Sequence, residues 1–264
     1  MKPTRLGQNF LVDKSVAENI VCSAELSCED TVIEIGPGKG ILTGLIAPLV
    51  KKLICVEIDP GLAFQLKEKF GNCKNVEIVT RDFLRWPIPT ASQTGSAVKF
   101  ISNLPYYITS PILNLALSYD NWQTAVFMVQ KEVGERILAA PGCREYGVLT
   151  LMVLFHAQPG KLFDVSRASF SPVPEVDSTV IKFTRKTPRE RCYPVTEKLF
   201  HRVIKSAFSQ RRKTVLNSMS AGLILPKNQI TELLVKNGVD PGIRPEHIPF
   251  DKFISLAIDL KTVI

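Results

Sequence analysis

The chain has 264 residues, of which 45% are hydrophobic and 22% charged, and its formal net charge is +8, as in a soluble globular protein with a substantial core. No segment approaches the roughly 20 consecutive apolar residues of a membrane-spanning helix, and the first ten residues lack the apolar stretch of a secretory signal, so we expect a cytoplasmic protein without membrane contact. The six cysteines and three histidines show no metal-ligand spacing, which argues against a metal site and favours free thiols in a reducing cytosol.

The first two-thirds of the chain alternates short apolar runs with longer amphipathic stretches. Runs rich in Val and Ile with few polar gaps are typical of strands buried on both faces of a parallel sheet. The predicted strands are Thr31–Ile35, Leu53–Ile58, Val76–Val79, Val98–Ser102 and Thr124–Val129, and the predicted helices are Ile41–Val50, Gly61–Phe70 and Pro111–Ser118. Strand–helix alternation predicts a doubly wound α/β domain.

Two later stretches, Lys161–Val165 and Ser178–Phe183, predict a terminal hairpin. Pro172 and Pro174 exclude a regular central strand between them. The segment Thr187–Pro194 then reads as a linker, and the pattern beyond it changes to helical spacing. The predicted C-terminal helices are Glu197–Phe208, Arg211–Ser220, Asn228–Lys236 and Phe250–Leu260.

The positive charge is concentrated in this last part of the chain. Residues 1–181 contain 17 Lys/Arg and 18 Asp/Glu, whereas residues 182–264 contain 16 Lys/Arg and 7 Asp/Glu. Such asymmetry predicts a surface that binds a polyanion. The alternative is a basic face that only promotes solubility.

A glycine-rich turn, Glu34-Ile35-Gly36-Pro37-Gly38-Lys39-Gly40, follows the first predicted strand and opens the first predicted helix. Glycines let the backbone turn sharply and approach a ligand without a Cβ clash. The pattern G-x-G-x-G differs from the dinucleotide pattern G-x-G-x-x-G, because Thr43 falls three residues after Gly40. Pro37 also removes an N–H from the turn, which makes it a poorer pyrophosphate cradle. A purely structural turn is the alternative.

Acids end the next two predicted strands. Glu57, in Val56-Glu57-Ile58-Asp59, can accept hydrogen bonds from both hydroxyls of a ribose. Asp82, in Arg81-Asp82-Phe83, can accept from the exocyclic amine of an adenine ring, or it can simply cap a turn. A glycine turn followed by an acid occurs in nicotinamide enzymes and in methyltransferases, so both classes stay open.

The motif Asn103-Leu104-Pro105-Tyr106-Tyr107 ends the fourth predicted strand, where the ligand crevice of a parallel sheet lies. An Asn amide oxygen and a nearby backbone carbonyl can accept from an amino group, and Tyr106 offers a flat face for base stacking. Two such acceptors favour a pyramidal adenine nitrogen whose lone pair points at a methyl donor. Positioning and electrostatics then suffice, and the motif predicts methylation of an adenine amine.

Further segments match one family over almost the whole chain. They are Gly7-Gln8-Asn9-Phe10-Leu11, the glycine turn with Leu42-Thr43, Val56-Glu57-Ile58-Asp59, Asn103-Leu104-Pro105-Tyr106, Gln130-Lys131-Glu132-Val133, Phe170-Ser171-Pro172-Val173-Pro174-Glu175-Val176-Asp177-Ser178 and Phe208-Ser209-Gln210-Arg211-Arg212-Lys213-Thr214. In these motifs the chain resembles the small-subunit ribosomal RNA adenine dimethyltransferases, relatives of the erythromycin-resistance methylases. One departure is Glu175, where the family pattern leads us to expect a basic residue.

The resemblance implies a Rossmann-like S-adenosylmethionine-dependent methyltransferase fold with one antiparallel terminal strand, over residues 1–189. A small basic helical RNA-binding domain is expected over 190–264. S-adenosylmethionine is the implied methyl donor, with no metal, and the implied substrate is two adjacent adenosines near the 3′ end of small-subunit rRNA, each methylated twice. We expect a monomer that acts on this rRNA or on the assembling small subunit. The implied cofactor contacts, with Gly38 of the glycine turn included, are Asn9, Leu11, Gly36, Gly38, Glu57, Asp82 and Asn103.

The expected catalytic set is Asn103, Leu104, Pro105, Tyr106 and Phe170. Phe170 is expected to stack on the target base opposite Tyr106, with a core aromatic as the alternative. RNA phosphates are expected to meet the basic side chains of the C-terminal domain, with a solvated face as the alternative. These side chains are Arg202, Lys205, Arg211, Arg212 and Lys213.

Three other functions are weighed against this one. A large-subunit adenine methylase that confers antibiotic resistance shares the chemistry, but the C-terminal domain favours the small-subunit enzyme. A non-catalytic RNA-binding or transcription factor on the same scaffold is disfavoured by the intact Asn-Leu-Pro-Tyr motif and ribose acid. A nicotinamide oxidoreductase would share the glycine turn and Glu57, but the sequence offers it no clear set of proton donors.

Overall fold

The computed structural model describes residues 9–187, 190, 193–210 and 212–261. The chain divides into two compact units, the first formed by Met1–Gly134 with Gln158–Arg185 and the second by Glu135–Ala157 with Lys186–Ile264. The main change of unit therefore falls at residue 186, close to the expected 190. Residues 135–157, which the sequence predicts in the catalytic domain, instead belong to the second unit.

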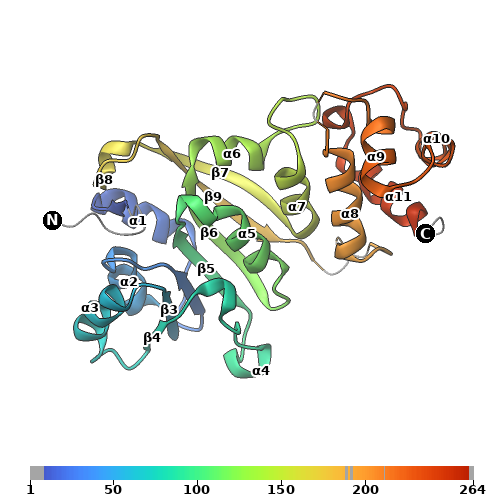
Figure 1. Ribbon diagram of the computed structural model, residues 1–264. Coiled ribbons are helices and arrows are strands. Elements are labelled where there is room, and N and C mark those ends of the chain that lie inside the picture. The colour runs from blue at the N-terminus through green and yellow to red at the C-terminus, as the bar shows by residue number, and fades with distance from the viewer. Residues whose placement is uncertain (1–8, 188–189, 191–192, 211, 262–264) are drawn as a thin grey trace. The chain divides into compact units, whose positions relative to one another are not determined.

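A seven-stranded sheet with the order β4-β3-β2-β5-β6-β9-β7 forms the centre of the first unit (Figure 1). Strands β4, β3, β2, β5 and β6 run parallel, and β9 is antiparallel to β6. This arrangement confirms the Rossmann-like methyltransferase fold, with the last strand along the chain as the antiparallel one. The strands are β2 (Thr31–Ile35), β3 (Lys52–Glu57), β4 (Val76–Thr80), β5 (Val98–Asn103), β6 (Trp122–Gln130), β7 (Ala157–Val165) and β9 (Ser178–Arg185).

Helices and short 3₁₀ turns connect these strands. They are α1 (Lys14–Ser23), α2 (Ile41–Ile46), η1 (Ala47–Leu49), α3 (Pro60–Phe70), η2 (Phe83–Arg85), α4 (Ala91–Thr94), η3 (Tyr106–Ile108), α5 (Thr109–Ser118), α6 (Lys131–Leu138) and η4 (Arg167–Ser169). The helix predicted over 41–50 is shorter and ends in the 3₁₀ turn η1, where Pro48 occupies an early position.

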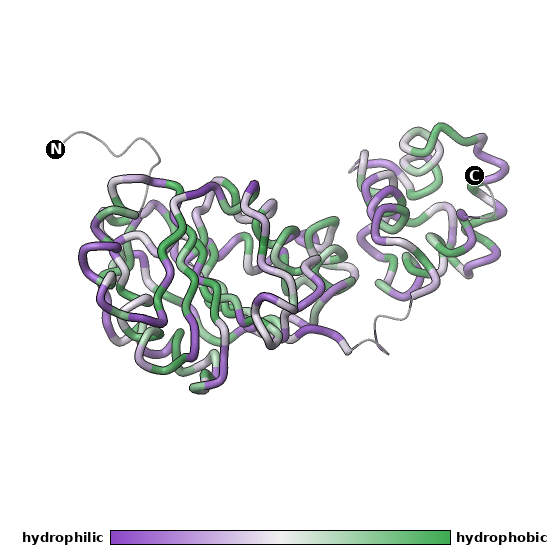
Figure 2. Tube along the Cα trace, turned by 90° about the horizontal axis from the view of Figure 1, so that it is seen from below, coloured by the Kyte–Doolittle hydropathy of each residue, from purple (hydrophilic) through white to green (hydrophobic). Residues whose placement is uncertain are grey.

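The central strands β2, β3 and β5 are buried on both faces, as their continuous apolar runs predict, whereas the outer strands β4 and β7 are partly exposed. Figure 2 colours the chain by hydropathy and shows green, hydrophobic strands in the middle of the first unit. On one face, Val32 and Ile101 join a core with Ile20 of α1 and Leu42 of α2. The other face carries aromatic rings, with Phe127 lying 6.5 Å from Phe100 and 5.7 Å from Phe183 between ring centroids. Burial of this kind contributes most of the stability of a domain.

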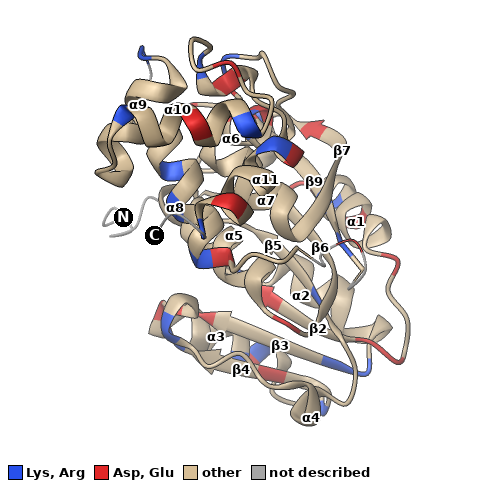
Figure 3. Ribbon diagram, turned by 90° about the vertical axis from the view of Figure 1, so that its right-hand side faces the viewer, with Lys and Arg blue, Asp and Glu red and all other residues tan. Residues whose placement is uncertain are grey.

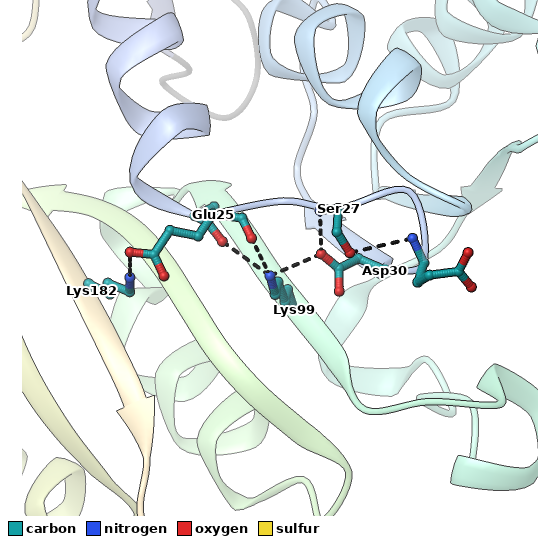
Figure 4. Close-up of polar contacts among 7 residues, drawn as sticks. Glu25, Ser27, Asp30, Lys99 and Lys182 are labelled. Atoms are coloured by element: carbon teal, nitrogen blue, oxygen red, sulfur yellow. Dashed lines mark hydrogen bonds and ion pairs between the residues drawn. The ribbon is translucent and has the colours of Figure 1, made fainter.

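A buried ion pair fastens the loop between α1 and β2 to the sheet, near the amino end of β5 (Figure 4). Lys99 is only 9% exposed. Its Nζ lies 2.9 Å from Asp30 Oδ2 and donates to the Glu25 carbonyl at 2.6 Å. The Glu25 carboxylate in turn pairs with Lys182 of β9 at 2.8 Å. A buried charge needs such partners, and here they hold together three separate parts of the chain.

The second unit is helical and has a core of its own. Its elements are α7 (Val148–His156), α8 (Glu197–Ala207), α9 (Val215–Leu223), α10 (Lys227–Lys236), η5 (Pro245–His247) and α11 (Phe250–Leu260). Phe155 of α7 stacks on Phe200 of α8 with centroids 4.7 Å apart, and Leu151 joins the same core. This packing explains why residues 135–157 belong here. Among the described residues, no helix is both long enough and apolar enough to span a bilayer.

Candidate active site

The carboxyl ends of β2, β3 and β5 border a cavity of about 500 Å³ in the first unit. All seven residues predicted to contact the cofactor line it. So do four of the five predicted catalytic residues, namely Asn103, Leu104, Pro105 and Tyr106. The structure therefore brings the separate sequence motifs together, because parallel strands present their carboxyl ends at one edge of the sheet.

The glycine turn between β2 and α2 requires the left-handed backbone region. Gly36, Gly38 and Gly40 have φ values of +64°, +58° and +76°, which residues other than glycine rarely adopt. A Cβ at Gly40 would lie 2.8 Å from side-chain atoms of Leu66 and Phe70. The glycines therefore both make the turn and let it pack closely against α3.

Glu57, at the end of β3, is 2% exposed and reaches back to the glycine turn. Its Oε2 accepts from the Gly38 N–H at 3.0 Å, and its Oε1 accepts from the Asp59 N–H at 3.0 Å. Burial raises the pKa of Glu57, and these N–H groups oppose the rise. Glu57 also lines the cavity, so its carboxylate is available there as an acceptor for hydroxyl donors of a ligand.

A second carboxyl, Glu34, lies at the base of the cavity and is 1% exposed. Its Oε2 accepts from the Thr43 hydroxyl at 2.7 Å and from the Cys55 thiol at 3.5 Å. Burial raises the pKa of Glu34 to about 7, although the Thr43 and Cys55 hydrogen bonds oppose the rise. The nearby Glu57 adds to the increase, so the two acids share one poorly solvated region.

Asp82 caps a turn and also lies at the cavity. Its Oδ1 accepts from the Leu84 N–H at 3.0 Å and so caps the 3₁₀ turn η2. Its Oδ2 lies 3.8 Å from Arg85 Nε. The residue nevertheless lines the cavity, so capping does not remove it from the site.

The segment Asn9–Leu11 covers part of the cavity and is held by a two-stranded sheet. β1 (Phe10–Leu11) pairs with β8 (Phe170–Ser171) in antiparallel register. Ser169 strengthens the pairing, because its Oγ donates to Asp13 Oδ2 at 3.1 Å. A Cβ built on Gly38 would lie 3.1 Å from the Phe10 ring, which shows how closely this segment approaches the glycine turn.

Asn103 has its amide oriented by this N-terminal segment. The Nδ2 group donates to the Asn9 carbonyl at 3.4 Å. The Oδ1 atom is buried and has no hydrogen-bond partner among the described residues. An unsatisfied buried acceptor is costly, and here it belongs to a side chain that lines the cavity. Its position therefore fits a donor supplied by a ligand.

The following loop is fixed by the sheet and by α5. The Leu104 N–H donates to the Met128 carbonyl of β6 at 3.0 Å. The Thr109 hydroxyl donates to the Pro105 carbonyl at 3.1 Å and lies 3.3 Å from the Tyr106 carbonyl. The glycine turn is adjacent, since a Cβ at Gly36 would lie 3.9 Å from Pro105 Cγ. Groups bound at the turn and at this loop would thus be close neighbours.

Phe170 lies elsewhere than the sequence predicts. Its side chain is 2% exposed and packs in the core with Leu11, Val165 and Val180. It is not among the described residues that line the cavity. Stacking on a base would require Phe170 to leave this core. In this structure Phe170 is a core aromatic residue, which was the alternative interpretation of the sequence.

Several residues that line the cavity were not assigned from the sequence, among them Phe10, Ile58 and Tyr107. Phe10 covers the glycine turn, while Ile58 and Tyr107 are 44% and 57% exposed beside the cavity. Such large apolar groups at strand ends fit the flat faces of a nucleoside. Their signal in the sequence was only their place inside motifs already noted for neighbouring residues.

The basic residues predicted to contact RNA belong to the second unit. Arg202 and Lys205 are exposed on α8, and Arg212 and Lys213 are exposed before α9. Figure 3 shows Lys and Arg positions along α8 in blue. Arg211 lies outside the described residues. Lys198, also exposed on α8, lies one turn before Arg202 and on the same face, although the sequence reading did not include it.

Within the described ranges, no group of three or more His, Cys, Asp or Glu side chains is arranged to hold a metal ion. The site instead offers carboxylate and amide oxygens, a glycine turn open to close approach, and apolar walls. This donor set fits a nucleoside whose ribose hydroxyls and amines need acceptors, and a cationic group near buried acids.

A family model and known proteins match the chain over nearly its whole length. The model of the family described as "Ribosomal RNA adenine dimethylase" matches residues 1–261. The chain is 43% identical over 252 residues to ribosomal RNA small subunit methyltransferase A of Desulfitobacterium hafniense, covering 94% of this chain and 88% of the relative. It is 39% identical over 254 residues to the protein of the same name from Clostridium botulinum, with 96% and 91% covered.

Two solved structures are similar over nearly their full lengths. A dimethyladenosine transferase from Plasmodium falciparum has a TM-score of 0.80 at 26% identity, covering 96% of this chain and 98% of that one. The 23S rRNA methyltransferase ErmE has a TM-score of 0.69 at 27% identity, covering 96% and 100%. With several of its motifs assembled around one cavity, the chain belongs to the ribosomal RNA adenine dimethylase family and is an S-adenosylmethionine-dependent rRNA adenine dimethyltransferase.

Proposed function

We propose that the cavity binds S-adenosylmethionine, which supplies a methyl group carried on a positively charged sulfur. Glu57 would accept from the ribose hydroxyls and Asp82 from the adenine amine. The glycine turn, with Gly36 and Gly38, would lie against the ligand, and Asn9 and Leu11 would close over it. Support comes from the oxygen acceptors and the left-handed glycines that border this cavity.

The target adenine amine would be held by Asn103 and its loop. Asn103 Oδ1 and the Leu104 carbonyl would accept the two amine hydrogens, which favours a pyramidal nitrogen with its lone pair free. Pro105 shapes the loop, and Tyr106 would stack on the base. The single observation that carries this proposal is the buried Asn103 Oδ1 atom, which lacks a hydrogen-bond partner within the described chain. Positioning supplies the catalysis, with no dedicated base.

We further infer that the substrate is small-subunit rRNA, in free form or in the assembling subunit, and that two adjacent adenosines near its 3′ end take four methyl groups. The names of the relatives support the small subunit. Phosphates would contact the basic residues of the second unit, which position RNA without reading its sequence. The proposed contacts are Arg202, Lys205, Arg211, Arg212 and Lys213. A cytoplasmic monomer is the simplest form of such an enzyme.

Mass spectrometry of rRNA tests this proposal. Unmethylated small subunits and, separately, large-subunit rRNA would be incubated with the protein and isotope-labelled S-adenosylmethionine. We expect N6,N6-dimethyladenosine in two adjacent positions of small-subunit rRNA alone. Label confined to large-subunit rRNA would assign the protein to the resistance methylases, and the absence of both label and cofactor binding would indicate a non-catalytic RNA-binding protein.

A further inference from the structure

The sequence signature Phe170–Ser178 ends in a serine whose hydroxyl has a specific partner. Ser178 is the first residue of β9 and is 0% exposed. Its Oγ lies 2.7 Å from the phenolic oxygen of Tyr106, in a hydrogen bond that either oxygen can donate. The two residues are 72 positions apart in the chain. Their contact therefore joins the signature to the loop 103–106, called the catalytic loop below.

Tyr106 is also held near its backbone. The Thr109 hydroxyl lies within hydrogen-bond distance of its carbonyl oxygen, and the residue begins the 3₁₀ turn η3. Its ring is half-buried and lines the cavity. Without a partner for the hydroxyl, the ring would keep rotational freedom about its side-chain bonds. The Ser178 hydrogen bond removes that freedom at the far end of the side chain.

We propose that Ser178 is a positioning residue, which holds the Tyr106 ring in the orientation that accepts the target base. A stacking surface that is already oriented loses less conformational entropy when the base enters the pocket. The inference deepens the proposed function and rests on it, because the role of Tyr106 at the base is part of that proposal.

The amino end of the same signature supports Asn103, at the amino end of the catalytic loop. Phe170 and Ser171 pair with β1, the strand that follows Asn9, whose carbonyl accepts from the Asn103 amide. Phe170 in the core and Ser178 beside Tyr106 thus both support the loop without entering the cavity. The buried position of Phe170 becomes understandable as part of this support.

A double-mutant cycle tests the role of Ser178. S178A removes the partner hydroxyl, and Y106F removes the phenolic hydroxyl while keeping the ring. Because a hydrogen bond of this kind contributes modestly, we expect each variant to lower kcat for rRNA methylation about 3- to 10-fold. The double variant should be no slower than the slower single variant. The Kd for S-adenosylmethionine and the KM for rRNA should stay within about twofold of the wild type.

The adjacent Thr179 provides a matched control. It is 2% exposed on the same strand, and its hydroxyl donates to the Phe163 carbonyl instead of the site. T179V should therefore keep the wild-type kcat, while any general loss from disturbing β9 would appear in both variants as a lower melting temperature.

Each outcome separates the inference from the proposed function. A wild-type kcat in S178A, or a double variant whose loss equals the product of the two single losses, would overturn the role of Ser178 while the enzyme remains active. If S178A is unstable, Y106F alone still decides, since an unchanged kcat in Y106F removes any need for a partner. If the wild-type protein methylates no adenine, the proposed function itself fails.

Discussion

Asn103 uses the two ends of its amide for different purposes. The Nδ2 group is committed to the Asn9 carbonyl, which leaves Oδ1 as a buried acceptor. A carboxylate at this position would repel that carbonyl, and an aliphatic residue would offer no acceptor. Asn103 therefore offers a buried, uncharged acceptor, as the proposed contact with the adenine amine requires.

We predict that Asn103→Ala lowers kcat by about 100-fold or more, the loss found when a preorganised hydrogen-bonding group is removed from a transition state. The free energy of unfolding should change by less than about 1 kcal/mol, because the variant also removes an unsatisfied buried atom. Single-turnover methylation and chemical denaturation measure the two quantities. Asn121→Ala is the control, since Asn121 bonds to Thr94 and Ser96 outside the cavity. Wild-type turnover in Asn103→Ala would remove this residue from the mechanism.

Glu57→Ala should weaken S-adenosylmethionine binding about 10- to 100-fold, because hydrogen bonds to a charged group contribute about 1.5–3 kcal/mol each. Calorimetric titration gives the dissociation constant. Glu77→Ala removes an exposed carboxylate that pairs with Lys52 on the same sheet. This control variant should leave the dissociation constant unchanged. Equal affinities of wild type and Glu57→Ala would contradict the ribose assignment.

At the scale of elements, the helix α8 has two faces with different tasks. Phe200, Val203 and Ile204 are buried in the core of the second unit, while Lys198, Arg202 and Lys205 are exposed. The spacing of three and four residues places these cations on one side of the helix. That side is the best defined part of the proposed RNA surface.

Reversing two of these charges, in R202E with K205E, should weaken rRNA binding and reduce the slope of log affinity against log salt by about two units, since each phosphate contact contributes about one. Filter binding between low and moderate salt gives the slope. K227E, an exposed reversal at the start of α10, controls for net charge. Parallel lines for wild type and the double variant would show that α8 does not contact the RNA backbone.

The elements also show where local patterns suffice. The prediction for Thr31–Ile35 matches β2, and that for Phe250–Leu260 matches α11, because each has a clear period and clear ends. The sequence patterns do not predict helix α7. Its sequence, Val148–His156, is almost wholly apolar, so it lacks the one-sided pattern that distinguishes a helix from a buried strand.

At the scale of the whole molecule, charge and burial are distributed unevenly. The second unit contains most of the positive excess, whereas the first buries two acids, Glu34 and Glu57, beside one cavity. Acids held in poorly solvated surroundings favour a cationic ligand, but they make the ligand-free protein sensitive to pH.

Glu34 allows this sensitivity to be measured. Its pKa is raised from 4.5 to about 7 in the folded protein, so the folded state binds more protons than the unfolded chain between these values. The free energy of unfolding should therefore fall as pH rises through that range, by up to about 3 kcal/mol from this group. E34Q should lack this fall, as measured by chemical denaturation without cofactor from pH 4.5 to 8.

Glu68 on α3 is exposed. The variant E68Q removes the same charge from the surface and therefore controls for the change in net charge. If the free energy of unfolding falls in parallel for wild type and E34Q as pH rises, burial does not raise the pKa of Glu34 in the folded protein.

The class of fold, the family and the strand ends that border the cavity follow from the amino-acid sequence alone. They do so because strand periodicity, glycine turns and motif spacing act over a few residues. Parallel pairing then brings the strand ends to one edge of the sheet, so residues that line the cavity could be predicted from the sequence.

Other features depend on long-range packing. They are the Asn103 atom that lacks a partner among the described residues, the core position of Phe170, the contact of Ser178 with Tyr106, and the membership of residues 135–157 in the second unit. The physical reason is sequence distance. Asn103 and Asn9 are separated by 94 positions, and no local pattern encodes which distant groups become neighbours when the sheet, the N-terminal strand and the signature loop pack together.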